Sequence, residues 1–310
     1  MPVIIPETLP ATQCLTDEGI FVMNKQRANT QDIRPLKIAI LNLMPNKIAT
    51  ETQLLRKLSN SIVQVEITLV AIEHHQTKNT APSHLNAFYR HFNEIKHQFF
   101  DGLIITGAPV EHLDFEAIDY WQELQTILDW SKNHVFCSLF ICWASQAALY
   151  HFYGINKEPF ANKLSGVYPH KKSVTHDALF FGMDDVFYVP QSRNTASTET
   201  AIRNHNKLVV LAESDQAGIH LVATHNRRQV FMSGHPEYDD ETLLNEFLRD
   251  SAANKNVPLP QNYFHNNDPS QGIETRWKSH AALFYQNWLN YYVYQATNYE
   301  LNEKTLIKPD

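Results

Sequence analysis

The chain has 310 residues, of which 43% are hydrophobic and 19% charged, and its net charge is −7. This balance excludes a disordered chain and leaves no basic surface of the kind that binds nucleic acid. The sequence shows neither a secretory leader nor an apolar stretch of membrane-spanning length. Three cysteines, at positions 14, 137 and 142, cannot form a closed set of disulfides, which favours a reducing compartment. We therefore expect a soluble cytoplasmic protein that binds neither nucleic acid nor membrane.

The first half of the chain alternates between strand-like and helix-like segments. Residues 1–34 show no clear periodicity, so we expect an irregular N-terminal arm ahead of a single domain over residues 35–310. Apolar runs predict strands at residues 37–43, 63–72, 101–109 (ending in a small-residue loop) and 135–141. Helical patterns follow each of them, at residues 46–58, 80–92, 116–130 and 143–153. This order predicts an α/β fold with an open, mostly parallel sheet, helices on both faces and ligands beyond the carboxyl ends of the strands.

Short strands dominate the second half of the chain. They are predicted at residues 186–189, 208–212, 219–224 and 229–233. An amphipathic helix at 239–250, a long loop at 258–268 and an aromatic-rich helix at 276–294 complete the chain. We expect this last loop and helix to wrap on the same domain.

Cys142 stands between the predicted strand 135–141 and the helix that Gly154 closes. A thiol at a helix N-terminus is held near backbone N–H groups and the positive end of the helix dipole, which favour the reactive thiolate. The alternative is a buried thiol that acts as a small hydrophobe, which is the commoner fate of cysteine and our interpretation of Cys137. The choice between them depends on the rest of the chain.

A His-x-Glu pair, His235 and Glu237, follows the predicted strand 229–233. Residues two apart in an extended segment point to the same side, so the carboxylate would orient the imidazole and support its positive charge. A thiol nucleophile needs such a base. The alternative is a surface turn with both side chains solvated. Because the pair and Cys142 both lie at strand ends of one sheet, we favour the catalytic interpretation.

The order strand, cysteine, helix and then a distant strand with His-x-Glu resembles the class I glutamine amidotransferase fold. In that fold the loop matching residues 105–109, with Gly107 and Ala108, supplies oxyanion donors, and Trp143 would add one. Those enzymes usually have Gly-x-Cys-x-Gly, whereas this chain has Phe140 and Ala144 around Cys142. The departure argues against a glutaminase.

A closer resemblance links the chain to the homoserine O-acyltransferases of methionine biosynthesis. It rests on colinear segments at residues 33–51, 100–109, 141–149, 163–168, 233–239, 262–269 and 288–295, which include LNLMPNK, ICWASQAAL and SGHPEYD. The resemblance implies a ping-pong reaction, in which an acyl-CoA acylates the cysteine and the homoserine hydroxyl then attacks the thioester.

The resemblance also implies roles for individual residues. Cys142 matches the nucleophile, His235 the general base and Glu237 its partner. The positions that contact the amino-acid substrate match Lys163, Ser192 and Arg249. Without the resemblance, Arg249 would be a helix-end charge and Lys163 a solvated loop charge.

Glu111 determines which acyl donor we expect. In this family a glycine after the ITGAP loop resembles the succinyl-CoA users and a glutamate the acetyl-CoA users, and this chain has Glu111. A carboxylate lining the acyl pocket repels the free carboxylate of a succinyl group and leaves room for an acetyl methyl. We therefore predict a homoserine O-acetyltransferase. The alternatives are the same enzyme with succinyl-CoA, a glutaminase-like thiol hydrolase and a non-catalytic binding module; a solvated loop carboxylate is the other interpretation of Glu111.

The expected partners are L-homoserine and acetyl-CoA, the latter as co-substrate, with no further cofactor. No metal site is expected, since His74, His75 and the scattered histidines lack a ligand spacing with partners. Lys47 is either a contact to CoA or substrate or a solvated charge at a helix start. The resemblance and the aromatic C-terminal helix are compatible with a homodimer.

Overall fold

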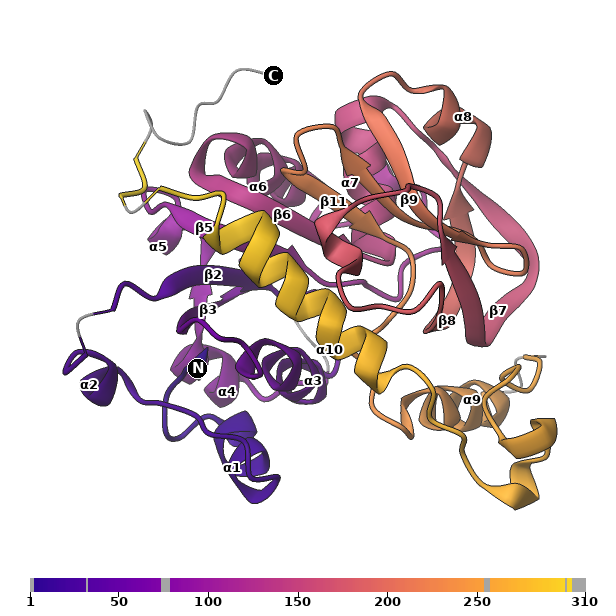
Figure 1. The fold of residues 1–310 in the computed structure, drawn as a ribbon, viewed down its shortest axis with the longest axis horizontal. Coiled ribbons are helices and arrows are strands. Elements are labelled where there is room, and N and C mark those ends of the chain that lie inside the picture. The colour runs from indigo at the N-terminus through magenta and orange to yellow at the C-terminus, as the bar shows by residue number, and fades with distance from the viewer. Residues whose placement is uncertain (1–2, 32, 74–78, 254–256, 299, 303–310) are drawn as a thin grey trace.

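A computed structural model describes residues 3–31, 33–73, 79–253, 257–298 and 300–302. One large sheet organises the fold (Figure 1), with the strand order β1-β3-β2-β5-β6-β11-β10-β9-β7-β8, and β4 beside β3. The strands from β1 to β11 in this order pair in parallel, as does β4 with β3. The remaining strands pair antiparallel. The prediction of an open, mostly parallel α/β sheet is confirmed.

The strand bounds lie close to the predicted ones in the parallel half of the sheet. The strands are β1 (Val3–Ile4), β2 (Leu36–Leu41), β3 (Val65–Ala71), β4 (Tyr89–His91), β5 (Phe100–Ile105), β6 (Val135–Ile141), β7 (Lys157–Lys172), β8 (Val186–Ser197), β9 (Leu208–Ser214), β10 (Gly218–Thr224) and β11 (Gln229–Met232). The helices are α1 (Pro10–Asp17), α2 (Lys25–Ala28), α3 (Lys47–Ser59), α4 (Pro82–Phe88), α5 (Phe92–Ile95), α6 (Trp121–His134), α7 (Trp143–Tyr153), α8 (Glu199–Asn204), α9 (Thr242–Ala252) and α10 (Lys278–Asn287), which continues as the π-helical segment η5 (Trp288–Tyr294).

Both faces of the parallel strands are buried, which explains their nearly continuous apolar runs. Ile38 and Ile40 of β2 face one core, beneath α1, α3 and the α10–η5 helix. Ala39 and Leu41 face the other core, beneath α6 and α7. Since side chains alternate across a strand, one short apolar run supplies two separate cores.

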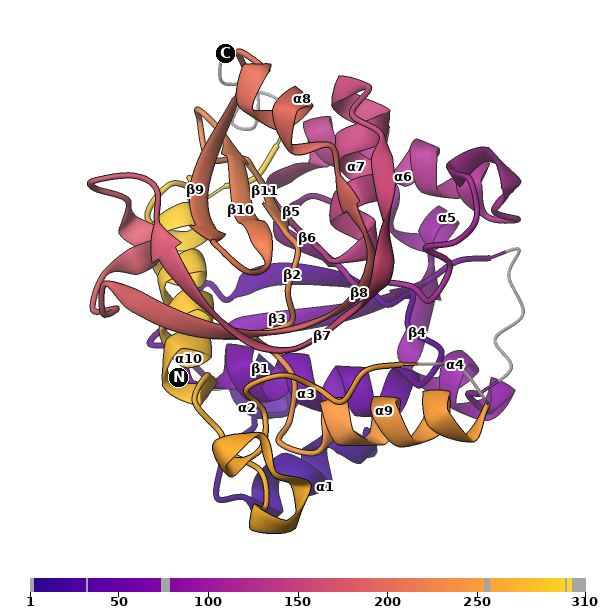
Figure 2. The ribbon, with the colours of Figure 1, turned by 90° about the vertical axis from the view of Figure 1, so that its right-hand side faces the viewer.

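Three features of the sequence-based prediction were wrong. The predicted helix at 80–92 is interrupted by the short strand β4, which pairs with β3. The strand prediction did not include β7 and ended β8 too early, before its extension to Ser197. Strands β7 and β8 form the long curved pair in Figure 2. The N-terminal arm is less irregular than expected, because β1 joins the edge of the sheet and α1 packs on α3.

At Gly102 the C-terminal helix packs closely on the sheet. A Cβ at this position would lie 2.7 Å from Cδ1 of Ile38 and 2.9 Å from Cη2 of Trp288. Trp288 is fully buried. The absence of a side chain at Gly102 therefore lets η5 seat its indole on β5.

The variant Gly102→Ala is expected to lower the free energy of unfolding by about 1–3 kcal/mol, because an added methyl in a close-packed core forces neighbouring side chains off their preferred rotamers. Thermal unfolding followed by circular dichroism measures the change. An unfolding midpoint equal to that of the wild-type protein would show that the core around Trp288 accommodates the methyl group without loss of stability.

Candidate active site

Cys142 lies in a strained turn between β6 and α7. Its backbone has φ 53° and ψ −116°, outside the regions that residues other than glycine normally adopt. Its N–H donates to the carbonyl of Met232 at 2.7 Å, which ties the turn to the end of β11. The turn places the thiol at the carboxyl edge of the sheet and at the N-terminus of α7. The predicted strand, thiol-bearing turn and helix are all present.

Cys137 shows what an ordinary core cysteine looks like in the same strand. It is fully buried, and burial raises the pKa of its thiol to about 12. Its thiol donates to the carbonyl of Arg227 at 3.3 Å. Cys137 is therefore held as a neutral thiol, in agreement with its prediction as a core residue.

The loop after β5 lies directly against Cys142. A Cβ on Gly107 would be 3.2 Å from Cβ of Cys142 and 3.7 Å from the amide nitrogen of Trp143. Leu43 N–H donates to Oγ1 of Thr106 at 2.8 Å, which anchors this loop to the end of β2. The first N–H groups of a helix have no partner within the helix, so the amide of Trp143 at the start of α7 is available as a donor. The structure thus brings Gly107, the neighbouring Ala108 and Trp143 together at the thiol.

His235 and Glu237 form the pair that their spacing predicted. Nδ1 of His235 lies 2.7 Å from Oε1 of Glu237, and both side chains are buried. Burial opposes a positive charge on His235, but the attraction of Cys142 and Glu237, each also hydrogen-bonded to the ring, raises the pKa of His235 well above its ordinary value. The ring of Tyr238 stacks on the imidazole with a centroid distance of 4.2 Å. The arrangement stabilises the positive charge that His235 acquires when it takes a proton.

Gly234, which precedes His235, lets the segment after β11 approach β8. The N–H of His235 donates to the carbonyl of Pro190 at 2.8 Å. A Cβ on Gly234 would lie 2.6 Å from Cγ1 of Val189 and 2.9 Å from that same carbonyl oxygen. Gly234 therefore determines how closely His235 is held to the rest of the site.

Tyr285 of α10 also reaches this pair, and the sequence did not indicate it. Burial and the neighbouring carboxylate of Glu237 raise the pKa of the Tyr285 phenol well above its ordinary value. The aromatic C-terminal helix therefore packs directly behind the residue that orients His235.

The predicted substrate contacts gather around two carboxylates of α9. Lys163 of β7 binds Asp250 at 2.8 Å and lies 3.9 Å from Glu246. Arg249 also binds Asp250, at 3.0 Å, while its side chain stays 63% exposed. The hydroxyl of Ser192 donates to Glu246. The structure thus brings Lys163, Ser192 and Arg249 together.

Glu246 and Asp250 were missed by the sequence analysis. They are four residues apart on α9 and so share one helix face. Tyr238, which stacks on His235, donates its hydroxyl to Oε1 of Glu246 at 2.8 Å. Glu246 therefore links the cluster around Lys163 to the imidazole. The amphipathic pattern of the helix was the only available signal. It did not distinguish these carboxylates from solvated ones.

Glu111 is buried and directed at the thiol. Its Oε1 lies 3.8 Å from Sγ of Cys142. Its Oε2 accepts hydrogen bonds of 2.8 Å from both the backbone N–H and the side-chain amide of Asn194. Lys157 donates to the carbonyl of Glu111 and, at 2.5 Å, to that of Leu113. The solvated-loop interpretation of Glu111 is therefore wrong, because the side chain is buried and pinned by β8.

Lys47 is the first residue of α3, directly after the turn that follows β2. Its side chain is buried, and its ammonium donates to the carbonyls of Asn42 and, at 3.4 Å, Met44. Burial lowers the pKa of Lys47 to about 8, with Glu51 opposing the shift. The interpretation of Lys47 as a solvated helix-start charge is wrong. The ammonium group of Lys47 therefore binds the carbonyls of the turn between β2 and α3.

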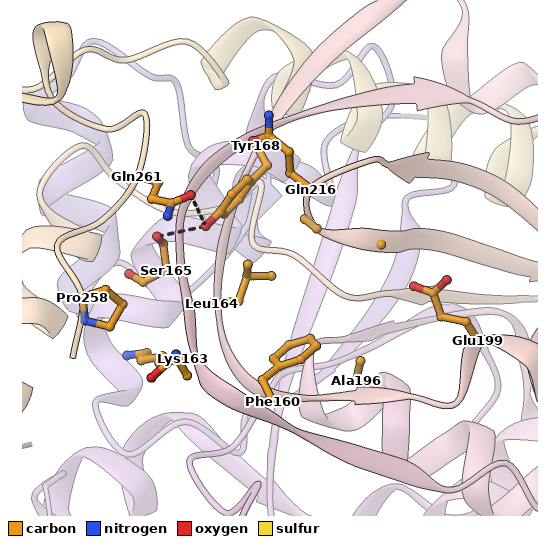
Figure 3. A pocket seen from close by; sticks show the side chains of 13 residues that line it. Phe160, Lys163, Leu164, Ser165, Tyr168, Ala196, Glu199, Gln216, Pro258 and Gln261 are labelled. Carbon is orange, nitrogen blue, oxygen red and sulfur yellow. Dashed lines mark hydrogen bonds between the residues drawn. The ribbon is translucent and has the colours of Figure 1, made fainter. Parts of the chain in front are cut away.

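Open space surrounds this edge of the sheet. A cavity of about 790 Å³ lies beside Lys163 (Figure 3), with Phe160, Leu164, Tyr168, Glu199 and Gln261 among its lining residues. A second cavity, of about 620 Å³, includes Glu111 and Lys157. The described residues contain no group of three or more His, Cys, Asp and Glu side chains placed to hold a metal ion. His74 and His75 lie outside those residues. Within the same ranges, no helix has the length and apolarity needed to span a bilayer.

The variant Gly234→Ala is expected to slow alkylation of Cys142 by iodoacetamide by roughly tenfold at neutral pH, since a one-unit change in pKa corresponds to a factor of ten. The added methyl must displace His235, which weakens its interaction with the thiol. Mass spectrometry of the Cys142 peptide gives the rate, and the unfolding midpoint verifies the fold. An unchanged rate in a folded variant would show that the position of His235 does not control the thiol.

Comparison with known proteins assigns the chain to a family. The family model for homoserine O-succinyltransferase matches residues 2–299. A homoserine O-succinyltransferase of Shewanella amazonensis is 50% identical over 309 residues, covering 100% of this chain and 98% of the relative. A homoserine O-acetyltransferase of Petrotoga mobilis is 51% identical over 302 residues, covering 97% and 98%.

A solved glutamine amidotransferase from Thermotoga maritima shares the fold, with a TM-score of 0.56 and 12% sequence identity over 84% of this chain and 99% of that one. This likeness agrees with the fold that the order of strands and motifs predicted. The chain therefore belongs to the homoserine O-succinyltransferase family, a family of homoserine acyltransferases.

Proposed function

We propose that this chain is a homoserine O-acetyltransferase, which transfers the acetyl group of acetyl-CoA to the hydroxyl of L-homoserine through a thioester on Cys142. The observation that carries the choice of donor is the Glu111 carboxylate, buried 3.8 Å from Sγ of Cys142. An acyl group bound to that sulfur must share its surroundings with this carboxylate.

The surroundings of Glu111 suit a small, uncharged acyl group. Both of its hydrogen bonds to Asn194 come from neutral donors, so they hold the carboxylate in place without neutralising it. A succinyl group carries a second carboxylate, and bringing like charges together at a buried site costs several kcal/mol. An acetyl group ends in a methyl and meets no such repulsion.

Overall similarity does not decide between the two donors. The relatives named as a succinyltransferase and as an acetyltransferase are 50% and 51% identical to this chain. Donor choice must therefore depend on individual side chains in the acyl pocket. Homoserine O-succinyl transfer is the second candidate, favoured by the name of the family model.

The geometry supports a covalent reaction in two halves. In the first, His235 takes the proton of Cys142, the sulfur attacks the thioester carbonyl, and the amides of Ala108 and Trp143 would stabilise the oxyanion. The carbon–sulfur bond to CoA then breaks, and the CoA thiolate takes the proton from His235. In the second half, His235 takes the proton of the homoserine hydroxyl, the oxygen attacks the Cys142 thioester, and the proton returns to the cysteine sulfur as the ester leaves. Glu237 supports the imidazolium in both halves.

The cluster on α9 provides groups for both charged ends of an amino acid. Arg249 offers a planar fork that suits a carboxylate, and its exposure leaves it free to turn toward a ligand. Lys163 adds a second cation at the same place. Glu246, fixed by Ser192 and Tyr238, offers a carboxylate for the α-ammonium group. An amino acid bound by these groups would lie beside His235, the base that its hydroxyl requires.

Intact-mass spectrometry tests the covalent step. Wild-type protein mixed with acetyl-CoA alone is expected to gain the mass of one acetyl group and to lose it when homoserine is added. The variant Cys142→Ala should gain no mass, and its turnover should fall by a factor on the order of 10³ or more, as for other nucleophile deletions. Absence of the adduct together with ammonia release from glutamine would contradict the proposal and favour the thiol hydrolase. Tight binding of ligands without turnover would favour a binding module.

Glu111→Gly tests the donor preference. The wild-type protein is expected to have the higher kcat/KM with acetyl-CoA. In the variant, the ratio of kcat/KM for succinyl-CoA to that for acetyl-CoA should rise by at least about tenfold, because the repulsion by the carboxylate is removed. Asp114→Gly is the matched control, since it deletes an exposed carboxylate from the same loop. A wild-type preference for succinyl-CoA would establish the second candidate instead.

A further inference from the structure

Arg193 is a buried cation that the reaction described above does not use. It lies in β8 with a relative exposure of 2%. Its guanidinium donates to Oε1 of Gln191 at 3.0 Å, to the carbonyl of Thr195 at 3.1 Å and to the carbonyl of Ala217. The ring of Phe160 covers it at 5.0 Å. All of these partners are electrically neutral.

Arg193 has no counter-ion in direct contact. Among the residues that the structure describes, no carboxylate lies within 4.0 Å of its guanidinium nitrogens. A guanidinium does not lose its proton in a protein, and a buried charge is costly unless an opposite charge supports it. Burial lowers the pKa of Arg193. The strongest attractions that oppose this shift come from Cys142 and Glu111. The groups that support the cation are therefore those at which acyl transfer takes place.

Two short chains of contacts lead from Arg193 and its neighbour in β8 to the backbone of Cys142 and to Glu111. Arg193 and Cys142 line the same cavity of about 30 Å³. Thr195, which accepts from Arg193, exchanges hydrogen bonds of 2.8 and 3.1 Å with Gln146, whose own N–H donates to the carbonyl of Cys142 at 3.3 Å. The next residue along β8, Asn194, holds the Glu111 carboxylate.

The neighbouring histidines do not supply this positive charge. Burial, followed by repulsion from His170 and Arg193, lowers the pKa of His220 well below its ordinary value. Burial lowers the pKa of His170 to about 4. Both rings are therefore neutral near pH 7. On this side of Cys142 the permanent positive charge is that of Arg193.

We propose that Arg193 is a positioning residue of the site, whose buried guanidinium supports the negative charges of the Cys142 thiolate and the Glu111 carboxylate and ties β8 to the turn before β10. The inference rests on the proposed role of Cys142 as the acyl carrier. A second cation would offset the repulsion that a thiolate on Cys142 meets from Glu111 and Glu237. His235 supplies one positive charge on the side of the β11 loop, and Arg193 supplies the second from β8.

Several titratable groups interact with Cys142 or with Arg193, and the test must leave them unchanged. Cys142 interacts with groups on the loop after β5, on β8 and on the segment after β11, while Arg193 interacts also with β7, β10 and α8. These groups are Glu111, Tyr168, His170, Glu199, His220, His235, Glu237 and Tyr238. None of them is changed in the variants below.

Alkylation of Cys142 by iodoacetamide, measured across pH in the full-length protein, tests the proposal. In Arg193→Gln, the pH at which alkylation becomes half-maximal should rise by about one unit, and the rate at neutral pH should fall roughly tenfold. Arg193→Lys keeps the positive charge and should recover most of the wild-type profile. Arg228→Gln is the matched control, because Arg228 also donates to backbone carbonyls, those of Val135 and Phe136, but at the far end of β6.

Each outcome decides the question. A folded Arg193→Gln with the wild-type alkylation profile would overturn the inference, as would a loss in Arg193→Lys equal to that in Arg193→Gln. If Arg193→Gln does not fold, Arg193→Met, which brings no polar group of its own into the core, takes its place; failure of both neutral variants to fold would make Arg193 purely structural and overturn the proposal. Failure of the wild-type protein to gain an acetyl group is a separate result, which contradicts the proposed function and leaves the alkylation profile interpretable.

Discussion

The pairing of β6 with β11 is the interaction on which the site depends. These parallel strands end at the same edge, where the N–H of Cys142 donates to Met232 at 2.7 Å. Strand β6 delivers the thiol and β11 delivers His235 three residues after its end, although the two lie far apart in the chain. A one-residue shift in register would turn every side chain of β11 to the opposite face. Burial of both faces of these strands prevents such a shift, because it would place their apolar residues in the wrong core.

The antiparallel half of the sheet supplies polar side chains around the thiol and the α9 carboxylates. Strand β8 contributes Ser192, Arg193 and Asn194 in sequence, and these bind Glu246 of α9, the carbonyl of Ala217 and Glu111 respectively. Adjacent residues of a strand point to opposite faces, so one short stretch can contact elements on both sides of the sheet. The solved glutamine amidotransferase from Thermotoga maritima shares the fold.

Much of the fold could be predicted from the sequence because its signals are local. The apolar run of β6 and the helical pattern of α7 were recognised with the correct bounds, and the spacing of His235 and Glu237 placed their side chains together. The long strand β7 was missed, because its proline, glycine and lysine residues do not alternate clearly and most of its first half is exposed. Its pairing with β8, rather than its own composition, makes it a strand.

By itself, the sequence determined the order of the elements, the two buried faces of the parallel strands and the presence of a thiol and a His-x-Glu pair at strand ends. These follow from periodicity and composition over a few neighbouring residues. Only the tertiary structure decided which polar side chains are buried and which partners they have. Glu111 and Asn194 are 83 positions apart, and Lys163 and Asp250 are 87 positions apart. The burial of Arg193 and the contact of Glu111 with Cys142 arise in the same way. A charge is solvated or buried according to what the folded chain places around it, and no short stretch of sequence carries that information.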